Sequence, residues 1–287
     1  MVQDGSTGMR KFWLLLGCLV APPVCAALGI ALAAILGCVP AYAQQTPVAE
    51  VRPSFEVASI KPSKPDDNKH DWDSNTDRLT IESYTLRDLV ASAYGLKSTS
   101  QVLGGPDWMD KEHFDIAAKV DDAEIAKLKT MTGKERGKEW NAMMQSLLAD
   151  RFGLKVGRGE RTIPIYALVV AKSGAKLTAA APNQTGHSLS VHNTHMMAIS
   201  VSMSELADYL TEIHEIDNRV VVNRTGLSGS FDFKLDWALD PGNGTPEDSQ
   251  YPGLFTALRE QLGRELKTDK GPVDVVIVEA AREPAVD

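Results

Sequence analysis

Thr85-Leu86-Arg87-Asp88-Leu89 and Ser202-Met203-Ser204-Glu205-Leu206 share one pattern, in which a hydroxyl residue is followed three positions later by a carboxylate. This pattern is a capping box, in which the hydroxyl residue is the helix N-cap and the carboxylate bonds back to its backbone amide. Apolar residues recur at helical spacing after each box, so both stretches predict amphipathic helices with Arg87 and Ser204 on the exposed side. Two such helix starts suggest that the chain repeats one plan.

Further matched segments extend the comparison in both directions. Phe114-Asp115-Ile116 and Phe231-Asp232-Phe233 lie in alternating stretches that predict strands, and they are offset by 117 residues, as the capping boxes are. Pro164–Val170 and Pro272–Val278 are almost continuous apolar runs, typical of interior strands. We therefore predict an internal duplication with an α+β fold, in which each half is a mixed sheet with two helices.

Changes in composition suggest the boundaries of these halves. Lys61–Arg78 and Asp240–Pro246 read as exposed loops because they are rich in polar and turn-forming residues. The expected parts are a signal peptide (1–43), a linker (44–53), a first α+β half (54–178), a linker loop (179–195) and a second α+β half (196–287).

The N-terminal segment predicts export. Two basic residues precede an apolar run, 12–39, which ends at the small-x-small site Ala41-Tyr42-Ala43. This order is typical of a secretory signal peptide cleaved after Ala43, and it predicts a secreted or periplasmic protein. An uncleaved anchor and a lipoprotein acylated at Cys38 remain alternatives, and only these two would attach the protein to a membrane. All three cysteines lie in this segment, so the predicted mature chain has no thiol chemistry.

Composition places the chain among ordinary globular proteins, since 43% of its residues are hydrophobic and 24% are charged. Its formal net charge is −8, and the part after residue 43 carries −9. No long basic run interrupts this acidic chain. We therefore expect no nucleic-acid partner, because such a chain lacks the field that attracts a phosphate backbone.

Four residues are candidate binding residues. Asp115 and Asp232 occupy equivalent strand positions, which invites comparison with the paired carboxylates of aspartic proteases, but neither is followed by the Thr/Ser-Gly turn of that site. Trp108 and Asp110 follow the turn formed by Gly104-Gly105-Pro106. Trp108 either anchors a recognition loop or is buried and pins the turn.

Other groups of reactive residue types give no catalytic or metal site. His187, His192 and His195 lie among Ser, Asn and Thr, which predicts a solvated loop rather than the helix a His-x-x-His metal site would need. Gly226–Ser230 lacks the second glycine of a nucleophile elbow. Lys172-Ser173-Gly174 is similar to a β-lactamase strand, but no separate Ser-x-x-Lys helix precedes it. We predict no catalytic residue, metal or cofactor.

Taken together, the motifs resemble a soil-associated family of secreted bacterial proteins that is classed as a domain of unknown function. The segments that carry the resemblance are Phe55–Pro62, Thr85–Tyr94, Gly104–Trp108, Phe114–Lys119, Leu147–Leu154, Val222–Asp232 and Leu258–Gly263 with Glu283-Pro284. The resemblance covers nearly the whole predicted mature chain, and it implies no established activity and no catalytic residues.

The sequence therefore favours a secreted, non-catalytic binding or interaction module of unknown ligand, with a groove between its halves as the expected ligand surface. Its partner would be a protein or small ligand of the cell envelope. An alternative is an extracytoplasmic hydrolase acting on peptide or cell-wall material, using Asp115, Asp232 or the histidines at 187–195. A domain that docks with a membrane sensor or transporter is a third possibility.

Overall fold

The computed structural model describes residues 52–64, 70–75, 77–174, 176–181, 185–213, 216–239 and 251–285. They belong to one compact unit, Glu50–Asp287. The predicted signal peptide, the cysteines, nearly all of the linker and the loop at 240–246 lie outside the described residues. No helix within the described ranges is long and apolar enough to cross a membrane.

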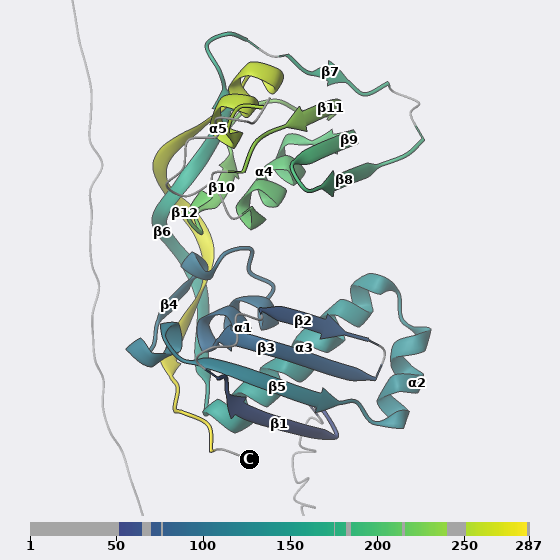
Figure 1. Ribbon diagram of the computed structural model, residues 1–287, viewed down its shortest axis with the longest axis vertical. Coiled ribbons are helices and arrows are strands. Elements are labelled where there is room, and N and C mark those ends of the chain that lie inside the picture. The colour runs from purple at the N-terminus through teal and green to yellow at the C-terminus, as the bar shows by residue number, and fades with distance from the viewer. Residues whose placement is uncertain are drawn as a thin grey trace, which may run out of the picture. The chain divides into compact units, whose positions relative to one another are not determined.

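Within the described residues, three four-stranded sheets and five α-helices confirm the predicted α+β class (Figure 1). The first sheet has the order β1 (Val57–Pro62), β5 (His113–Lys119), β3 (Arg78–Thr85), β2 (Asp71–Ser74). The central sheet has the order β10 (Val220–Asn223), β6 (Lys155–Val170), β12 (Arg264–Ala280), β4 (Val102–Gly104). The third sheet has the order β7 (Thr178–Ala179), β11 (Ser230–Asp236), β9 (His195–Ser202), β8 (Ser188–His192).

The helices divide into two groups, one in a lobe with the first sheet and one in a lobe with the third sheet. The first lobe consists of the first sheet with α1 (Leu86–Ala93), α2 (Asp122–Thr130), α3 (Gly133–Phe152) and the 3₁₀ turns η1 (Thr99–Gln101) and η2 (Asp107–Asp110). The second lobe consists of the third sheet with α4 (Met203–Glu212), α5 (Leu254–Ala257) and the π-helical turn η4 (Leu258–Leu262). Both predicted capping boxes are present, with Thr85 and Asp88 at α1 and with Ser202 and Glu205 at α4.

The first and third sheets have the same strand order and the same register. Strand pairs of the first sheet recur in the third sheet 117 residues later: Trp72↔Ile81 as Leu189↔Ala198, Ile81↔Ile116 as Ala198↔Phe233, Tyr84↔Phe114 as Val201↔Phe231, and Pro62↔Phe114 as Ala179↔Phe231. Each sheet also has a bulge at the same place, between β3 and β5 or between β9 and β11. The common origin of the halves stays a prediction.

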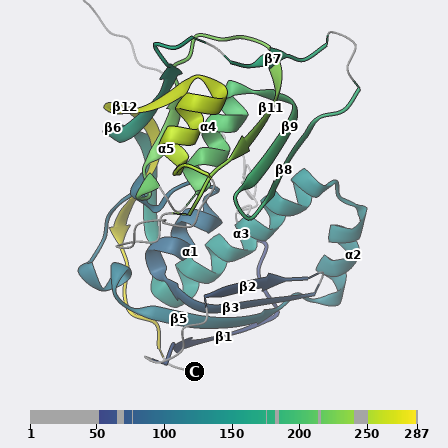
Figure 2. The ribbon, with the colours of Figure 1, turned by 45° about the horizontal axis from the view of Figure 1, so that its top comes forward.

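Two long strands connect the lobes. β6 and β12 pair antiparallel from Lys155↔Ala280 to Arg264↔Val170 (Figure 2). Val276 and Val278, near the end of β12, are buried in the core of the first lobe. Tyr166 and Leu168 of β6 are buried in the core of the second lobe. Each core is therefore completed by a long strand that begins in the other lobe.

The structure corrects several details of the predicted halves. The two lobe sheets are antiparallel, and only the central sheet is mixed, because β10 and β4 pair parallel to β6 and β12 there. The first half has three α-helices instead of two. β2 lies within the expected loop 61–78, where Trp72 packs against the first core. β7 and β8 lie within or beside the expected linker loop 179–195, and Leu189 and Val191 of β8 pack against the second core.

Candidate functional site

Asp115 and Asp232 hold the two bulges in place. Asp115 accepts a hydrogen bond from the Ser83 amide (3.0 Å), and Asp232 accepts one from the Ser200 amide (2.8 Å). Both serines have left-handed backbone conformations, with φ values of 62° and 55°. The two carboxylates lie on different sheets, each at a backbone amide, and this arrangement differs from a protease dyad that shares one proton.

Trp108 and Asp110 stabilise the turn after β4. Trp108 is half-buried and packs against Phe114 and Phe152, with ring centroids 6.3 and 6.5 Å away. Asp110 forms an ion pair with Arg87, whose guanidinium also donates to the carbonyl oxygens of Val102 and Gly104. Arg87 therefore joins α1 to β4 instead of projecting freely from the helix.

The three clustered histidines have separate surroundings. His187 Nε2 lies 2.7 Å from a carboxylate oxygen of Glu205, and His195 Nδ1 lies 2.8 Å from one of Asp236. His192 and His195 flank the turn of the β8–β9 hairpin, so this part of the expected loop is a strand pair. Among the residues that the structure describes, no group of three or more His, Cys, Asp or Glu side chains is arranged to hold a metal ion.

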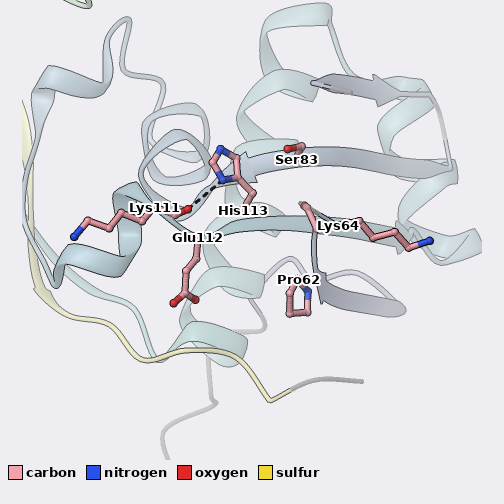
Figure 3. A pocket seen from close by; sticks show the side chains of 7 residues that line it. Pro62, Lys64, Ser83, Lys111, Glu112 and His113 are labelled. Atoms are coloured by element: carbon pink, nitrogen blue, oxygen red, sulfur yellow. Dashed lines mark hydrogen bonds between the residues drawn. The ribbon is translucent and has the colours of Figure 1, made fainter. Parts of the chain in front are cut away.

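A polar pocket of about 490 Å³ lies at one end of the first sheet (Figure 3). It forms where β1 ends, where β3 bulges and where the chain turns into β5. The backbone continues the β1–β5 pairing at this point, because the Ser63 amide donates to the His113 carbonyl oxygen at 2.9 Å. The lining residues are Pro62, Ser63, Lys64, Ser83, Lys111, Glu112 and His113.

The bulge supplies the middle of this pocket. Asp115 accepts a hydrogen bond from the Ser63 hydroxyl at 2.5 Å and another from the Ser83 amide. It therefore fixes the positions of two residues that line the pocket. His113 lies beside Ser83, and its Nδ1 is 3.2 Å from the Lys111 carbonyl oxygen (Figure 3). This geometry offers hydroxyl and imidazole groups that can donate or accept hydrogen bonds.

Charged side chains surround these groups. Lys64 and Lys111 extend from the pocket in opposite directions, and Glu112 points away from Ser83 (Figure 3). Next to the pocket, the His70 ring stacks on Tyr84 with centroids 3.9 Å apart, and His70 Nδ1 lies 3.1 Å from the Ser83 carbonyl oxygen. Burial, together with the nearby charges of Asp88 and Asp71, raises the pKa of Tyr84.

The second lobe shows which of these side chains the fold requires. At the positions 117 residues later, Ser63, Lys64, Lys111, Glu112 and His113 are replaced by Ala180, Ala181, Ser228, Gly229 and Ser230. The strand pairing is kept, since the Ala180 amide donates to the Ser230 carbonyl oxygen at the same 2.9 Å, although Gly229 has a φ of 88° that Glu112 does not share. This pairing therefore forms without the lysines, the glutamate or the histidine. These differences between the two halves are present in the sequence, but the equivalent positions could be identified only once the strand registers were known.

Residues 87–281, from α1 to just beyond β12, match the family described as "Protein of unknown function (DUF3738)". The chain belongs to this DUF3738 family. The match covers more than half of the chain and includes both lobes except β1, β2 and β3. It confirms the predicted resemblance to a domain of unknown function, whereas soil association and secretion stay predictions. Comparisons with curated proteins and with solved structures gave no match. None of the DUF3738 residues thereby acquires an assigned role.

Proposed function

We propose that this DUF3738 protein is an exported, non-catalytic binding module that holds a small polar ligand at the first-lobe pocket. One observation carries the proposal: the pocket has charged and hydrogen-bonding side chains where the equivalent backbone of the second lobe has alanine, glycine and serine. Polar groups gathered in a concave surface without a structural need are typical of ligand sites. The pocket replaces the groove between the halves as the ligand surface we favour.

The pocket chemistry suits a small molecule that carries a carboxylate and hydroxyl or amide groups. Lys64 and Lys111 line the pocket on two sides and would have to turn inward to reach an anionic group (Figure 3). Lys111 lies 4.0 Å from a carboxylate oxygen of Asp107, whereas Lys64 has no ion-pair partner among the described residues. Ser83 and His113 can hydrogen-bond to the uncharged part of the ligand. We place this ligand, or a protein presenting the same groups, in the cell envelope, and the acidic charge of the chain disfavours nucleic acid.

The hydrolase alternative has no observation in its favour. Asp115 and Asp232 are engaged with backbone amides on separate sheets. Within the described ranges, no serine hydroxyl is hydrogen-bonded to a histidine side chain. We therefore propose binding without turnover.

A thermal-shift experiment on the chain from Gln44 tests the ligand site. The probes are acetate, glutamate, the dipeptide alanyl-glutamate and N-acetylglucosamine. The variant Lys64→Ala/Lys111→Ser/His113→Ser has the residues of the second lobe, so we expect it to fold. A probe that binds at the pocket raises the Tm of the unaltered protein and not that of the variant. Lys234→Ala, at the exposed position of β11, is the control that should keep the response.

Two results would overturn this assignment. One is an equal Tm increase in the unaltered protein and the triple variant, which would place the ligand elsewhere. The other is a lack of response to every probe, which would exclude the ligand class. The proposed export is tested separately by N-terminal sequencing of the protein from cell fractions. A mature N-terminus at Gln44 supports cleavage, whereas an intact Met1 or Met9, or an acylated Cys38, contradicts it.

A further inference from the structure

A second pocket, on the second lobe, is rich in basic residues. It has a volume of about 510 Å³ and lies where the chain leaves β6 and where η4 passes into β12. Four basic and two acidic residues contribute to it. The lining residues are Ala171, Lys172, Ser173, Lys176, Arg259, Glu260, Glu265 and Lys267.

The backbone around this pocket is firmly held. The Ala171 amide donates to the Gly263 carbonyl oxygen at 2.9 Å, and the Lys176 amide donates to the Leu262 carbonyl oxygen at 3.2 Å. Gly263 has a φ of 63°, and a Cβ there would lie only 2.0 Å from the Gly174 oxygen. Only glycine allows this close approach. The basic side chains therefore project from a backbone of fixed geometry.

Two of the four cations are available to a ligand. Lys267 lies 3.6 Å from a carboxylate oxygen of Glu265, and Lys176 donates to the Glu260 carbonyl oxygen at 2.7 Å. Lys172 and Arg259 are exposed, and no acidic side chain in the described part of the chain forms an ion pair with them. This local excess of positive charge contrasts with the charge of −9 beyond residue 43.

Two of the four cations have no charged counterpart in the corresponding part of the first lobe, where Lys155 instead occupies the position of Glu265. Gly153 ends α3 with a φ of 57°, as Gly263 ends η4, which sets an offset of 110 residues. At that offset Arg259 corresponds to Ala149, and Lys267 corresponds to Gly157. Arg259 and Lys267 are therefore not needed to form a connection of this kind.

We propose that this second pocket binds a dianionic oxyanion, such as a phosphate group. An oxyanion with several oxygens needs several donors, which the Arg259 guanidinium, the Lys172 ammonium and the Ser173 hydroxyl supply. The excess of two positive charges matches the charge of a phosphate monoester near neutral pH. The phosphate can be free or can be the monoester headgroup of a lipid such as phosphatidic acid, because its chemistry at the pocket is the same.

Calorimetric titration of the chain from Gln44 with inorganic phosphate at low ionic strength tests this site. The variant Lys172→Ala/Arg259→Ala should bind phosphate about tenfold more weakly or not at all. The control Arg136→Ala/Lys234→Ala removes the same two charges from exposed positions elsewhere and should bind as the unaltered protein does. Added salt should weaken binding, because the cations are exposed. Equal affinities of the two double variants, or no binding of phosphate to the unaltered protein, would overturn the proposal.

Sedimentation with vesicles distinguishes the sources of the phosphate group. Binding to phosphatidic acid vesicles but not to phosphatidylcholine vesicles, abolished by Lys172→Ala/Arg259→Ala, identifies a lipid headgroup. Binding of inorganic phosphate without vesicle binding identifies a free ligand. The variant Lys64→Ala/Lys111→Ser/His113→Ser should keep full phosphate affinity, so the outcome is independent of the function proposed for the first lobe.

Discussion

Ser83 and Ser200 have a backbone conformation that costs about 1–2 kcal/mol for residues other than glycine. Asp115 and Asp232 offset this cost by accepting hydrogen bonds from the serine amides. Asp115 and Asp232, which the sequence suggested as binding residues, therefore stabilise the bulges of the two sheets. Asp115 connects this structural role to the first-lobe pocket, because it also binds the Ser63 hydroxyl.

Replacing either aspartate by alanine should lower the free energy of unfolding by about 1–3 kcal/mol, because a half-buried amide loses its acceptor. Asn should be tolerated better at both positions, since its carbonyl oxygen can still accept the hydrogen bond. Urea unfolding of the Ala and Asn variants measures this difference. Asp115→Ala and Asp232→Ala proteins as stable as the unaltered one would contradict the role of these carboxylates.

Arg264 is a buried cation at the start of β12 and is fully inaccessible to solvent. Its guanidinium donates to the Gly263 carbonyl oxygen (2.8 Å) and contacts the Met203 sulfur (3.5 Å), but Nη2 has no hydrogen-bond partner within the described ranges. Burial lowers the pKa of Arg264 because it disfavours the charged form. At the offset of 110, the first lobe has buried Leu154 instead.

Arg264→Leu should therefore raise the free energy of unfolding by about 1–4 kcal/mol, as when other buried charges are replaced by apolar side chains of similar volume. The reciprocal change Leu154→Arg should destabilise the first lobe, and it serves as the matched comparison. Urea unfolding of both variants gives the measurement. A less stable Arg264→Leu protein would show that the guanidinium has an acceptor that outweighs its burial.

At the scale of single elements, the capping box of α4 also has a charge that responds to pH. The backbone and hydroxyl of Ser202 donate to Glu205, and together with His187 they lower the pKa of that carboxylate. A carboxylate with a lowered pKa stabilises the folded state above its ordinary pKa of about 4.3 and loses this effect as the pH falls through the folded value.

Stability should accordingly decrease as the pH falls through this acidic range, and Glu205→Gln should make the decrease shallower. At neutral pH the variant should be less stable than the unaltered protein, because the amide replaces a charged hydrogen-bond acceptor. Urea midpoints measured across the acidic range test both statements. If the two proteins lose stability in parallel as the pH falls, Glu205 does not contribute to the acid sensitivity.

The elements differ in how far sequence could predict them. The starts of α1 and α4 were predictable because a capping box is a local pattern. The C-terminal parts of β6 and β12 were predictable because each is an almost continuous apolar run. Their N-terminal parts, Lys155–Thr162 and Arg264–Gly271, were not predictable, because polar residues dominate these stretches. β2 and β8 were missed because each is an edge strand with few buried side chains. The pocket residues could not be recognised without the register of β3 and β5, because His113 and Ser83 line the same pocket only through the pairing of these strands.

At the scale of the whole molecule, the crossing of β6 and β12 makes the lobes interdependent. The first core lacks Val276 and Val278 if the second half is absent, and the second core lacks Tyr166 and Leu168 if the first half is absent. Fully burying one aliphatic side chain contributes about 1.5–3 kcal/mol. Losing two from each core therefore removes much of the small net stability of a domain.

Fragments 44–184 and 185–287 should each fail to unfold cooperatively, and an equimolar mixture should regain a cooperative transition. Circular dichroism in increasing urea gives the comparison, with the intact chain as reference. A fragment that unfolds cooperatively on its own at the midpoint of the intact chain would show that one half is self-sufficient. The predicted division at 54–178 and 196–287 would then describe independent domains rather than interlocked ones.

The long strands also determine when folding can finish during synthesis. Val278 and Leu89 belong to the same core, so nearly the whole chain must emerge before that core is complete. At about 5–20 residues per second, synthesis from Leu89 to Val278 takes roughly 10 to 40 s. During this time the first lobe lacks its last strand, and its apolar core residues stay accessible to chaperones. The order of the strands along the chain thus delays folding until the last residues arrive, as passage of an extended chain through a membrane channel would require.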